Sequence, residues 1–181
     1  MANDRLLNGV YTRAKELVVA ALLLTSITVQ ADWFDDLPGA RSVGAGQFRW
    51  YGFAIYEARL WSKAQRPGLE TPFALEVTFL RKVKRETLVE ISRDEIRRLG
   101  GEDLPPERLA RWTLELRRAF VDVNSNQRIT GVFMPGRGCR FYVDGLLRHE
   151  VMDPVFARAF FSIWLDPRTR SPKLRRALLG L

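Results

Sequence analysis

The segment 128–151 most constrains the fold, because its pattern is that of three short strands joined by two tight turns. The apolar runs are RITGVFM, RGCRFYV and LLRHEV, and the turns between them are Pro135-Gly136 and Asp144-Gly145. An Asp-Gly pair between apolar runs is a strong signal for a two-residue hairpin. We therefore expect neighbouring strands to pair in the antiparallel direction.

Two further strand patterns precede this segment. FRWYGFAIYEARLW at 48–61 is dense in aromatic and branched residues and predicts one long strand or two in sequence. PFALEVTFL at 72–80 alternates apolar and polar residues and predicts another strand. Gly44-Ala45-Gly46 comes just before the first pattern. We interpret it as a turn or bulge rather than a phosphate-binding loop, because it does not open a helix.

Apolar spacing and capping residues predict helices in two further parts of the chain. The first pair follows the 72–80 strand and the second pair ends the chain: 88–99 closed by Gly100-Gly101, a helix after Asp103 as far as Phe120, 154–165 capped by Asp153, and 172–179 capped by Ser171. Strands, two helices, strands and two helices predict an α+β fold, with helices on one side of an antiparallel sheet.

The N-terminus predicts export from the cytoplasm. Residues 17–31, LVVAALLLTSITVQA, follow a mildly basic stretch and end in small residues at positions 29 and 31, as secretory signals do. The apolar run is also shorter than the roughly 20 residues that span a bilayer. We expect a signal peptide at 1–31, cleavage before Asp32, a single domain at 32–181 and a periplasmic location. An uncleaved anchor or a buried helix is the alternative.

The composition narrows the classes of function. The chain carries a net charge of +8, but its arginines are scattered among carboxylates, as on a solvated surface. We expect no nucleic-acid partner, and peripheral contact with an anionic membrane surface is the further prediction from this charge. Cys139 and His149 are the only cysteine and the only histidine, so a buried structural thiol is expected and no metal site or cofactor is predicted.

Arg49 and Tyr51 stand out in the 48–61 pattern, because strand alternation places them on one face with Phe53 and Ile55. A covered arginine needs a partner, since an unpaired buried charge is costly. That partner is either an internal carboxylate or the anionic head of a ligand, which a guanidinium and a phenol are able to grip together. A solvated Arg49 is the simpler alternative.

Four segments carry a resemblance to a known family: GAGQFRWYGFAIYEARLW, PFALEVTFL, PGRGCRFYVDG and DPVFARAFFSIWLDPRTRSPKLRRALLG. From about Val43 to Gly180 the chain resembles the chalcone isomerase-like family, specifically its bacterial exported branch. The resemblance implies an open-faced sandwich, in which helices are layered on one face of a large antiparallel sheet and a ligand cleft lies between the two layers.

The resemblance also implies two classes of activity. Some members close a chalcone into a flavanone, with an arginine after a Gly-Ala-Gly turn, a hydroxyl residue on the strand, and a tyrosine and an asparagine on the helix after the next strand. Others hold fatty acids without chemistry. Here Phe48 falls on the arginine position and Arg49 one step later, Tyr51 falls near the strand hydroxyl, and residues 81–99 contain neither tyrosine nor asparagine.

Three hypotheses follow. The first is a non-catalytic, exported protein that binds a fatty acid or similar amphipathic carboxylate in an apolar cleft, with Arg49 and Tyr51 at the head group and no catalytic residue. The second is an isomerase of the intramolecular lyase type, acting on an enone or phenolic substrate. The third is a structural or interaction module whose cleft is filled by its own side chains.

Overall fold

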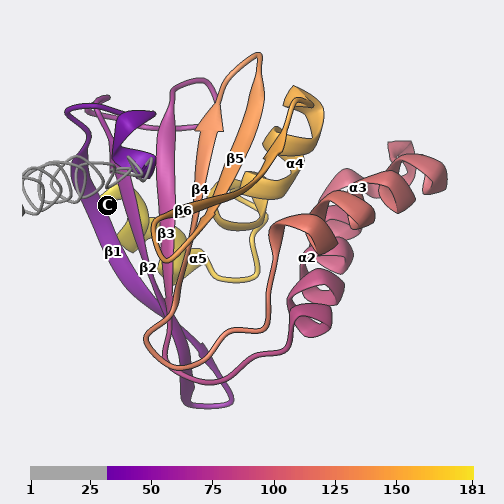
Figure 1. Cartoon of the computed structure of the whole chain (residues 1–181), viewed down its shortest axis with the longest axis horizontal. Coiled ribbons are helices and arrows are strands. Elements are labelled where there is room, and N and C mark those ends of the chain that lie inside the picture. The colour runs from indigo at the N-terminus through magenta and orange to yellow at the C-terminus, as the bar shows by residue number, and fades with distance from the viewer. Residues whose placement is uncertain (1–31) are drawn as a thin grey trace, which may run out of the picture. The chain divides into compact units, whose positions relative to one another are not determined.

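A computed structural model describes residues 32–181, and these residues form a six-stranded antiparallel sheet with four helices on one face (Figure 1). The strands lie in sequence order across the sheet, β1-β2-β3-β4-β5-β6. The strand bounds are Arg41–Trp50 (β1), Phe53–Ser62 (β2), Phe73–Phe79 (β3), Arg128–Met134 (β4), Gly138–Val143 (β5) and Leu146–Val151 (β6). This is the predicted α+β open-faced sandwich.

The helices form two pairs, one inserted between β3 and β4 and one after β6. Their bounds are Arg85–Gly100 (α2), Pro106–Ala119 (α3), Pro154–Leu165 (α4) and Pro172–Leu179 (α5), with short 3-10 turns at Trp33–Asp35 (η1) and Gly101–Asp103 (η2). Helix α4 contacts β4 and β5, α5 contacts β1 and β2, and α3 contacts β6, whereas α2 packs on α3 and α4. No helix within 32–181 is long and apolar enough to cross a membrane.

The main core lies between the sheet and the helices. Strand alternation places Phe73, Phe133 and Phe141 on this inner face, where they interlock with Phe160 and Phe161 of α4. All five phenylalanines are nearly inaccessible to solvent. Burial of so much apolar surface is the main force that stabilises the fold, and residues 31–181 form one compact unit that contains this core.

The strand β1 begins earlier than the sequence pattern indicates, at Arg41, so Gly44-Ala45-Gly46 lies inside a strand. The pairing with β2 shifts between Ser42 and Gly44, which is a bulge next to the glycines. A β-carbon on Gly44 would overlap the carbonyl oxygen of Ala177, because α5 crosses β1 at this point. The glycines therefore allow close packing of a helix on the strand.

The outer face of the sheet carries a second, smaller core that the sequence analysis did not anticipate. Trp33 and Leu37, from the segment that precedes β1, pack there against Ala74, Val132 and Tyr142 of three successive strands. Asp36 ties this segment to β5, because its carboxylate accepts hydrogen bonds from the Tyr142 hydroxyl and from Arg140. The predicted signal peptide, residues 1–31, lies outside the described residues.

Candidate functional site

Arg49 and Tyr51, the residues predicted to bind a ligand, lie at the tip of the β1–β2 hairpin. Tyr51 and Gly52 form the two-residue turn with φ of +46° and +84°. The Arg49 guanidinium donates from Nε and Nη2 to the carbonyl of Gly52, at 3.3 and 3.0 Å, and from Nη1 to Gln47. Arg49 thus stabilises the turn through these hydrogen bonds.

The expectation of a shared, covered face for these two residues is wrong. Tyr51 is a turn residue and is 86% exposed, and Arg49 is exposed on the strand end. The physical reason is that FRWYGFAIYEARLW is a hairpin rather than one strand, so the alternation that the pattern implies stops at Trp50. Ligand binding by Arg49 and Tyr51 stays a prediction.

A row of stacked aromatic rings runs from this tip toward the core. We call it the aromatic row: Trp50, Phe48 and Tyr56. The ring centres of Trp50 and Phe48 are 6.4 Å apart, and those of Phe48 and Tyr56 are 5.0 Å apart with nearly parallel planes. Phe48 and Tyr56 are register partners and pack against the main core, so the row lies on the inner face of the sheet.

Tyr56 ends the row with a polar group beneath a helix. Its hydroxyl oxygen accepts a hydrogen bond of 3.0 Å from the indole Nε1 of Trp164, which is on α4. Burial raises the pKa of Tyr56 well above its ordinary value, and the bond from Trp164 lowers it only in part. The group is therefore a neutral phenol at physiological pH.

The hydroxyl of Tyr56 is able to donate a further hydrogen bond. Trp164 uses one lone pair of the oxygen, and within residues 32–181 no acceptor for the O–H hydrogen is found. A neutral phenol with a free O–H donates a hydrogen bond to a carbonyl or carboxylate oxygen. Tyr56 lies within the 48–61 pattern, and the sequence analysis gave it no role, although a phenol among apolar residues is a signal for a required polar partner.

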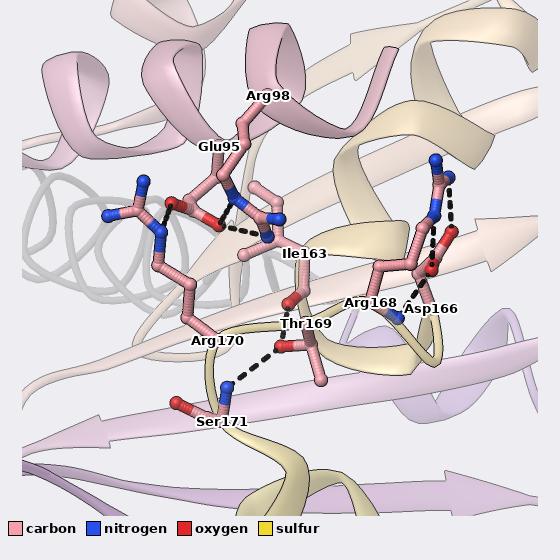
Figure 2. A network of polar contacts seen from close by, with 8 residues as sticks. All are labelled: Glu95, Arg98, Ile163, Asp166, Arg168, Thr169, Arg170 and Ser171. Carbon is pink, nitrogen blue, oxygen red and sulfur yellow. Dashed lines mark hydrogen bonds and ion pairs between the residues drawn. The ribbon is translucent and has the colours of Figure 1, made fainter. Parts of the chain in front are cut away.

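The end of α4 that carries Trp164 is held by the loop that follows it (Figure 2). Thr169 Oγ1 donates to the carbonyl of Ile163 at 2.7 Å and accepts from the backbone N–H of Ser171 at 3.2 Å. Asp166, the residue after the helix, pairs with Arg168 at 2.9 Å. These contacts fix the last turn of α4 and the position of the Trp164 indole.

The same loop is fastened to α2 through a carboxylate. Glu95 is buried on α2 and forms ion pairs with Arg98 at 2.8 Å and with Arg170 at 2.9 Å (Figure 2). Two guanidinium groups thus compensate the burial of one carboxylate. The SIWLDPRTR part of the sequence therefore serves to fix the helices over the sheet.

Two surface hollows of residues 32–181 lie apart from the apolar cleft expected between the sheet and the helices. One is at Lys84, Arg85, Glu86 and Asp122, and the other lies between α3 and the end of β6. Neither is lined by the aromatic row. The space above the sheet is occupied by the interlocked phenylalanines of the main core.

Cys139 and His149 have different surroundings in the sheet. Cys139 is buried as expected, and burial raises the pKa of its thiol. His149 is the register partner of Phe141, and its Nε2 lies 2.6 Å from Glu115. No group of three His, Cys, Asp or Glu side chains suited to a metal is found within residues 32–181.

Comparison with known proteins agrees with this architecture. A family model described as chalcone isomerase-like matches residues 39–180. An uncharacterized protein of Haemophilus influenzae is 26% identical over 169 residues, which cover 93% of this chain and 78% of that protein. The crystal structure of a fatty-acid binding protein of Arabidopsis thaliana superposes with a TM-score of 0.59 at 14% identity, covering 78% of this chain and 87% of the other.

Proposed function

Because this chain belongs to the chalcone isomerase-like family, we propose that it is a non-catalytic, exported binding protein for an amphipathic ligand such as a fatty acid. The observation that carries the proposal is the Tyr56 hydroxyl, which lies between the sheet and α4 at the end of an aromatic row and has no acceptor for its O–H within residues 32–181. An apolar site with a few well-placed polar groups is typical of small-molecule binding.

The fold supports the same class of function. The structure of the Arabidopsis thaliana fatty-acid binding protein shares the architecture over most of both chains. We propose that an amphipathic carboxylate accepts the Tyr56 hydrogen bond with its head, while its apolar chain lies against Phe48 and Trp50. Phe48 is half-buried and Trp50 is 56% exposed, so both rings are accessible to a ligand that arrives from the hairpin end.

The state of Tyr56 favours binding over catalysis. Intramolecular lyase chemistry of the kind weighed above is assisted by a group that accepts a proton near pH 7. The raised pKa of Tyr56 makes its phenolate unavailable at that pH, and the thiol of Cys139 is likewise held neutral. An isomerase acting on an enone is the alternative, and an assay of chalcone closure on the purified protein tests it.

The binding proposal is tested by one pair of substitutions that change the same atoms. We expect Tyr56→Phe to weaken binding of a radiolabelled C16 fatty acid by about 10- to 150-fold, because a hydrogen bond to a charged group contributes about 1.5–3 kcal/mol. Tyr51→Phe removes the same hydroxyl from the exposed turn and is the matched control. Native mass spectrometry of the purified protein, followed by denaturing extraction, identifies any ligand that is already bound.

The outcomes separate three hypotheses. Loss of affinity in Tyr56→Phe alone supports the proposed head-group position. Loss in Tyr51→Phe or Arg49→Ala alone places the head group at the hairpin tip, as the sequence analysis predicts. A purified protein that carries no extractable ligand and takes up no fatty acid contradicts the binding function and favours a module filled by its own side chains.

Export is a separate part of the proposal and has its own test. We propose that residues 1–31 are removed and that the mature protein begins at Asp32. Intact-mass measurement of the protein recovered from the periplasmic fraction of expressing cells should give the mass of 32–181. A full-length mass, or recovery from the cytoplasm alone, contradicts export.

A further inference from the structure

The tip of the β1–β2 hairpin exposes large aromatic side chains that the fold does not cover. Trp50, Tyr51 and Phe53, which we call the aromatic tip, are 56%, 86% and 60% exposed. Trp50 and Phe53 are register partners directly next to the turn, and the ring centres of Trp50 and Tyr51 lie 5.2 Å apart. The three side chains are therefore exposed together at the tip of the hairpin between β1 and β2, which lies at one end of the sheet (Figure 1).

The loop between β3 and α2 places positive charge beside this surface. Arg81 donates from Nε to the carbonyl of Ala54 at 3.2 Å, and its guanidinium carbon lies 5.0 Å from the centre of the Phe53 ring. Lys82 is exposed next to it. We call Arg81 and Lys82 the basic loop.

Carboxylates are absent from both segments, since 48–56 and 79–85 contain no aspartate or glutamate. Glu57, which follows the first segment, and Asp122, which contacts the second, have partners within the described residues. Glu57 accepts a hydrogen bond from Gln47, and Asp122 forms an ion pair with Lys84 and accepts from the backbone of Arg85. The end of the molecule that carries the aromatic tip is therefore apolar at its centre and positive at its side.

The hairpin turn that carries these rings has regular geometry and its own hydrogen bonds. The turn residues Tyr51 and Gly52 have the positive φ values of a two-residue hairpin turn. Arg49 fixes the turn by two hydrogen bonds to the carbonyl of Gly52. The aromatic tip is thus held in place without being buried, which a purely structural role does not require.

We propose that the aromatic tip and the basic loop together dock the protein on the surface of an anionic lipid bilayer. Tryptophan and tyrosine favour the boundary between head groups and acyl chains, because their rings are apolar and their N–H or O–H is polar. Arginine and lysine near the membrane plane are attracted by anionic lipids. The aromatic tip would lie at the boundary between head groups and acyl chains, and the basic loop would lie beside the anionic head groups. The protein would therefore dock in one orientation.

This proposal shares Trp50 with the proposed ligand site but does not use the Tyr56 hydroxyl, so Tyr56→Phe, which should leave vesicle binding unchanged, distinguishes the two. It is tested with residues 32–181, which contain both cores of the fold. Co-sedimentation is measured with vesicles of phosphatidylglycerol and phosphatidylethanolamine, and with vesicles of phosphatidylcholine alone. We expect binding to the anionic vesicles only, and weaker binding when the salt concentration is raised.

Two double variants separate the apolar and the charged contributions. We expect Trp50→Ser with Phe53→Ser to weaken the partition into anionic vesicles about tenfold or more, since two interfacial rings are lost. Arg81→Gln with Lys82→Gln should cause a loss of similar size and remove most of the salt dependence. Leu146→Ser with Leu147→Ser is the matched control, because these residues follow the β5–β6 turn and are 47% and 49% exposed.

A more conservative substitution tests the proposal even if the double variants fail to fold. Trp50→Phe retains an apolar ring, and circular dichroism melting should match the unchanged protein. In this variant we expect vesicle binding to persist while the blue shift of tryptophan emission on binding disappears, because Trp50 is the tryptophan at the interface.

The proposal is overturned if residues 32–181 ignore anionic vesicles, or if the two tip variants bind as the control does. It is also overturned if the aromatic tip proves to join two copies of the chain. Sedimentation equilibrium without lipid detects that case as a dimer that Trp50→Ser with Phe53→Ser dissociates. Equal binding by all variants to phosphatidylcholine would show unspecific adhesion and would likewise contradict docking.

Discussion

At the scale of single residues, the closest packing in the molecule occurs where a side chain is missing. Gly44 and Gly46 of β1 lie under Ala177 and Leu174 of α5, and a β-carbon on Gly131 of β4 would lie 2.8 Å from the Phe161 ring. Helices α5 and α4 thus approach the sheet at glycines. The core tolerates little added volume at such points, because protein interiors are already close-packed.

We expect Gly44→Ala to destabilise the protein by about 2–3 kcal/mol, because its methyl group would overlap the backbone of α5 and move the helix. Urea unfolding monitored by tryptophan fluorescence measures the change. Gly68→Ala is the matched control, since nothing lies within 4 Å of a β-carbon at that position. Equal stability of the two variants would show that α5 does not rest on β1 as described.

The conformation of a single residue also explains why the sequence analysis misplaced Tyr51. Asp144 and Gly145 have φ values of +48° and +85°, and Tyr51 and Gly52 have almost the same pair, +46° and +84°. The first turn was predicted, because Asp is common where φ is positive. The second was not recognised as a turn, because Tyr is rare there and lies in a continuous run of aromatic residues.

At the scale of elements, the sequence predicted the strands and helices well wherever a local signal marks both ends. Strands β4 and β6 and helices α4 and α5 have the predicted bounds, with Pro at the start of each helix. The start of β1 was missed, because three residues with little or no side chain, Gly44, Ala45 and Gly46, weaken the strand pattern. Their fit under α5 depends on a segment more than a hundred residues away.

The N-terminal ends of α4 and α5 are capped differently, although the sequence predicts a cap for both. Asp153 caps α4, since its carboxylate accepts from the backbone N–H groups of Val155 and Phe156 at 2.9 Å and from the Trp112 indole. Ser171 has the same position before α5 but makes no side-chain capping bond. The two capping residues therefore look alike in the sequence, but only Asp153 makes side-chain hydrogen bonds to the backbone of its helix.

We expect Asp153→Ala to lower the free energy of unfolding by about 2 kcal/mol, because a cap and a hydrogen bond to a buried indole are both lost. Ser171→Ala is the matched control and should change stability by less than about 0.5 kcal/mol. Thermal melting of the two variants, followed by circular dichroism, makes the comparison. A similar loss in both would mean that the Asp153 contacts contribute little.

At the scale of the whole molecule, the sheet is covered on both faces, although the helices lie on only one. The segment before β1 seals part of the outer face through Trp33, which is 3% exposed, and through Asp36 bound to Arg140 and Tyr142. This cover was not predictable, because a few residues without periodicity give no sequence signal for docking. It also gives the proposed cleavage before Asp32 a structural consequence, since processing a few residues later would remove Trp33.

We expect Trp33→Ala to destabilise the protein by about 3–5 kcal/mol, as for other buried aromatic residues. Phe34→Ala is the control, because Phe34 stacks on Trp33 but is 42% exposed, and its loss should cost about 1 kcal/mol. Urea unfolding gives both values. A small effect of Trp33→Ala would show that the outer cover is dispensable.

The strand order has a consequence for the time course of folding. Strands β1 to β3 and β4 to β6 are each joined by short connections, but β3 ends at Phe79 and its neighbour β4 begins at Arg128. The groups β1–β3 and β4–β6 are therefore able to nucleate independently. They pair with each other only after the long segment between β3 and β4, which contains α2 and α3, has brought them together. We expect Val77→Ala, at the seam, mainly to accelerate unfolding in stopped-flow experiments, whereas Val143→Ala, beside the Asp144-Gly145 turn, slows refolding. The single six-stranded sheet would then form from two three-stranded halves, and the pairing of β3 with β4 would form last.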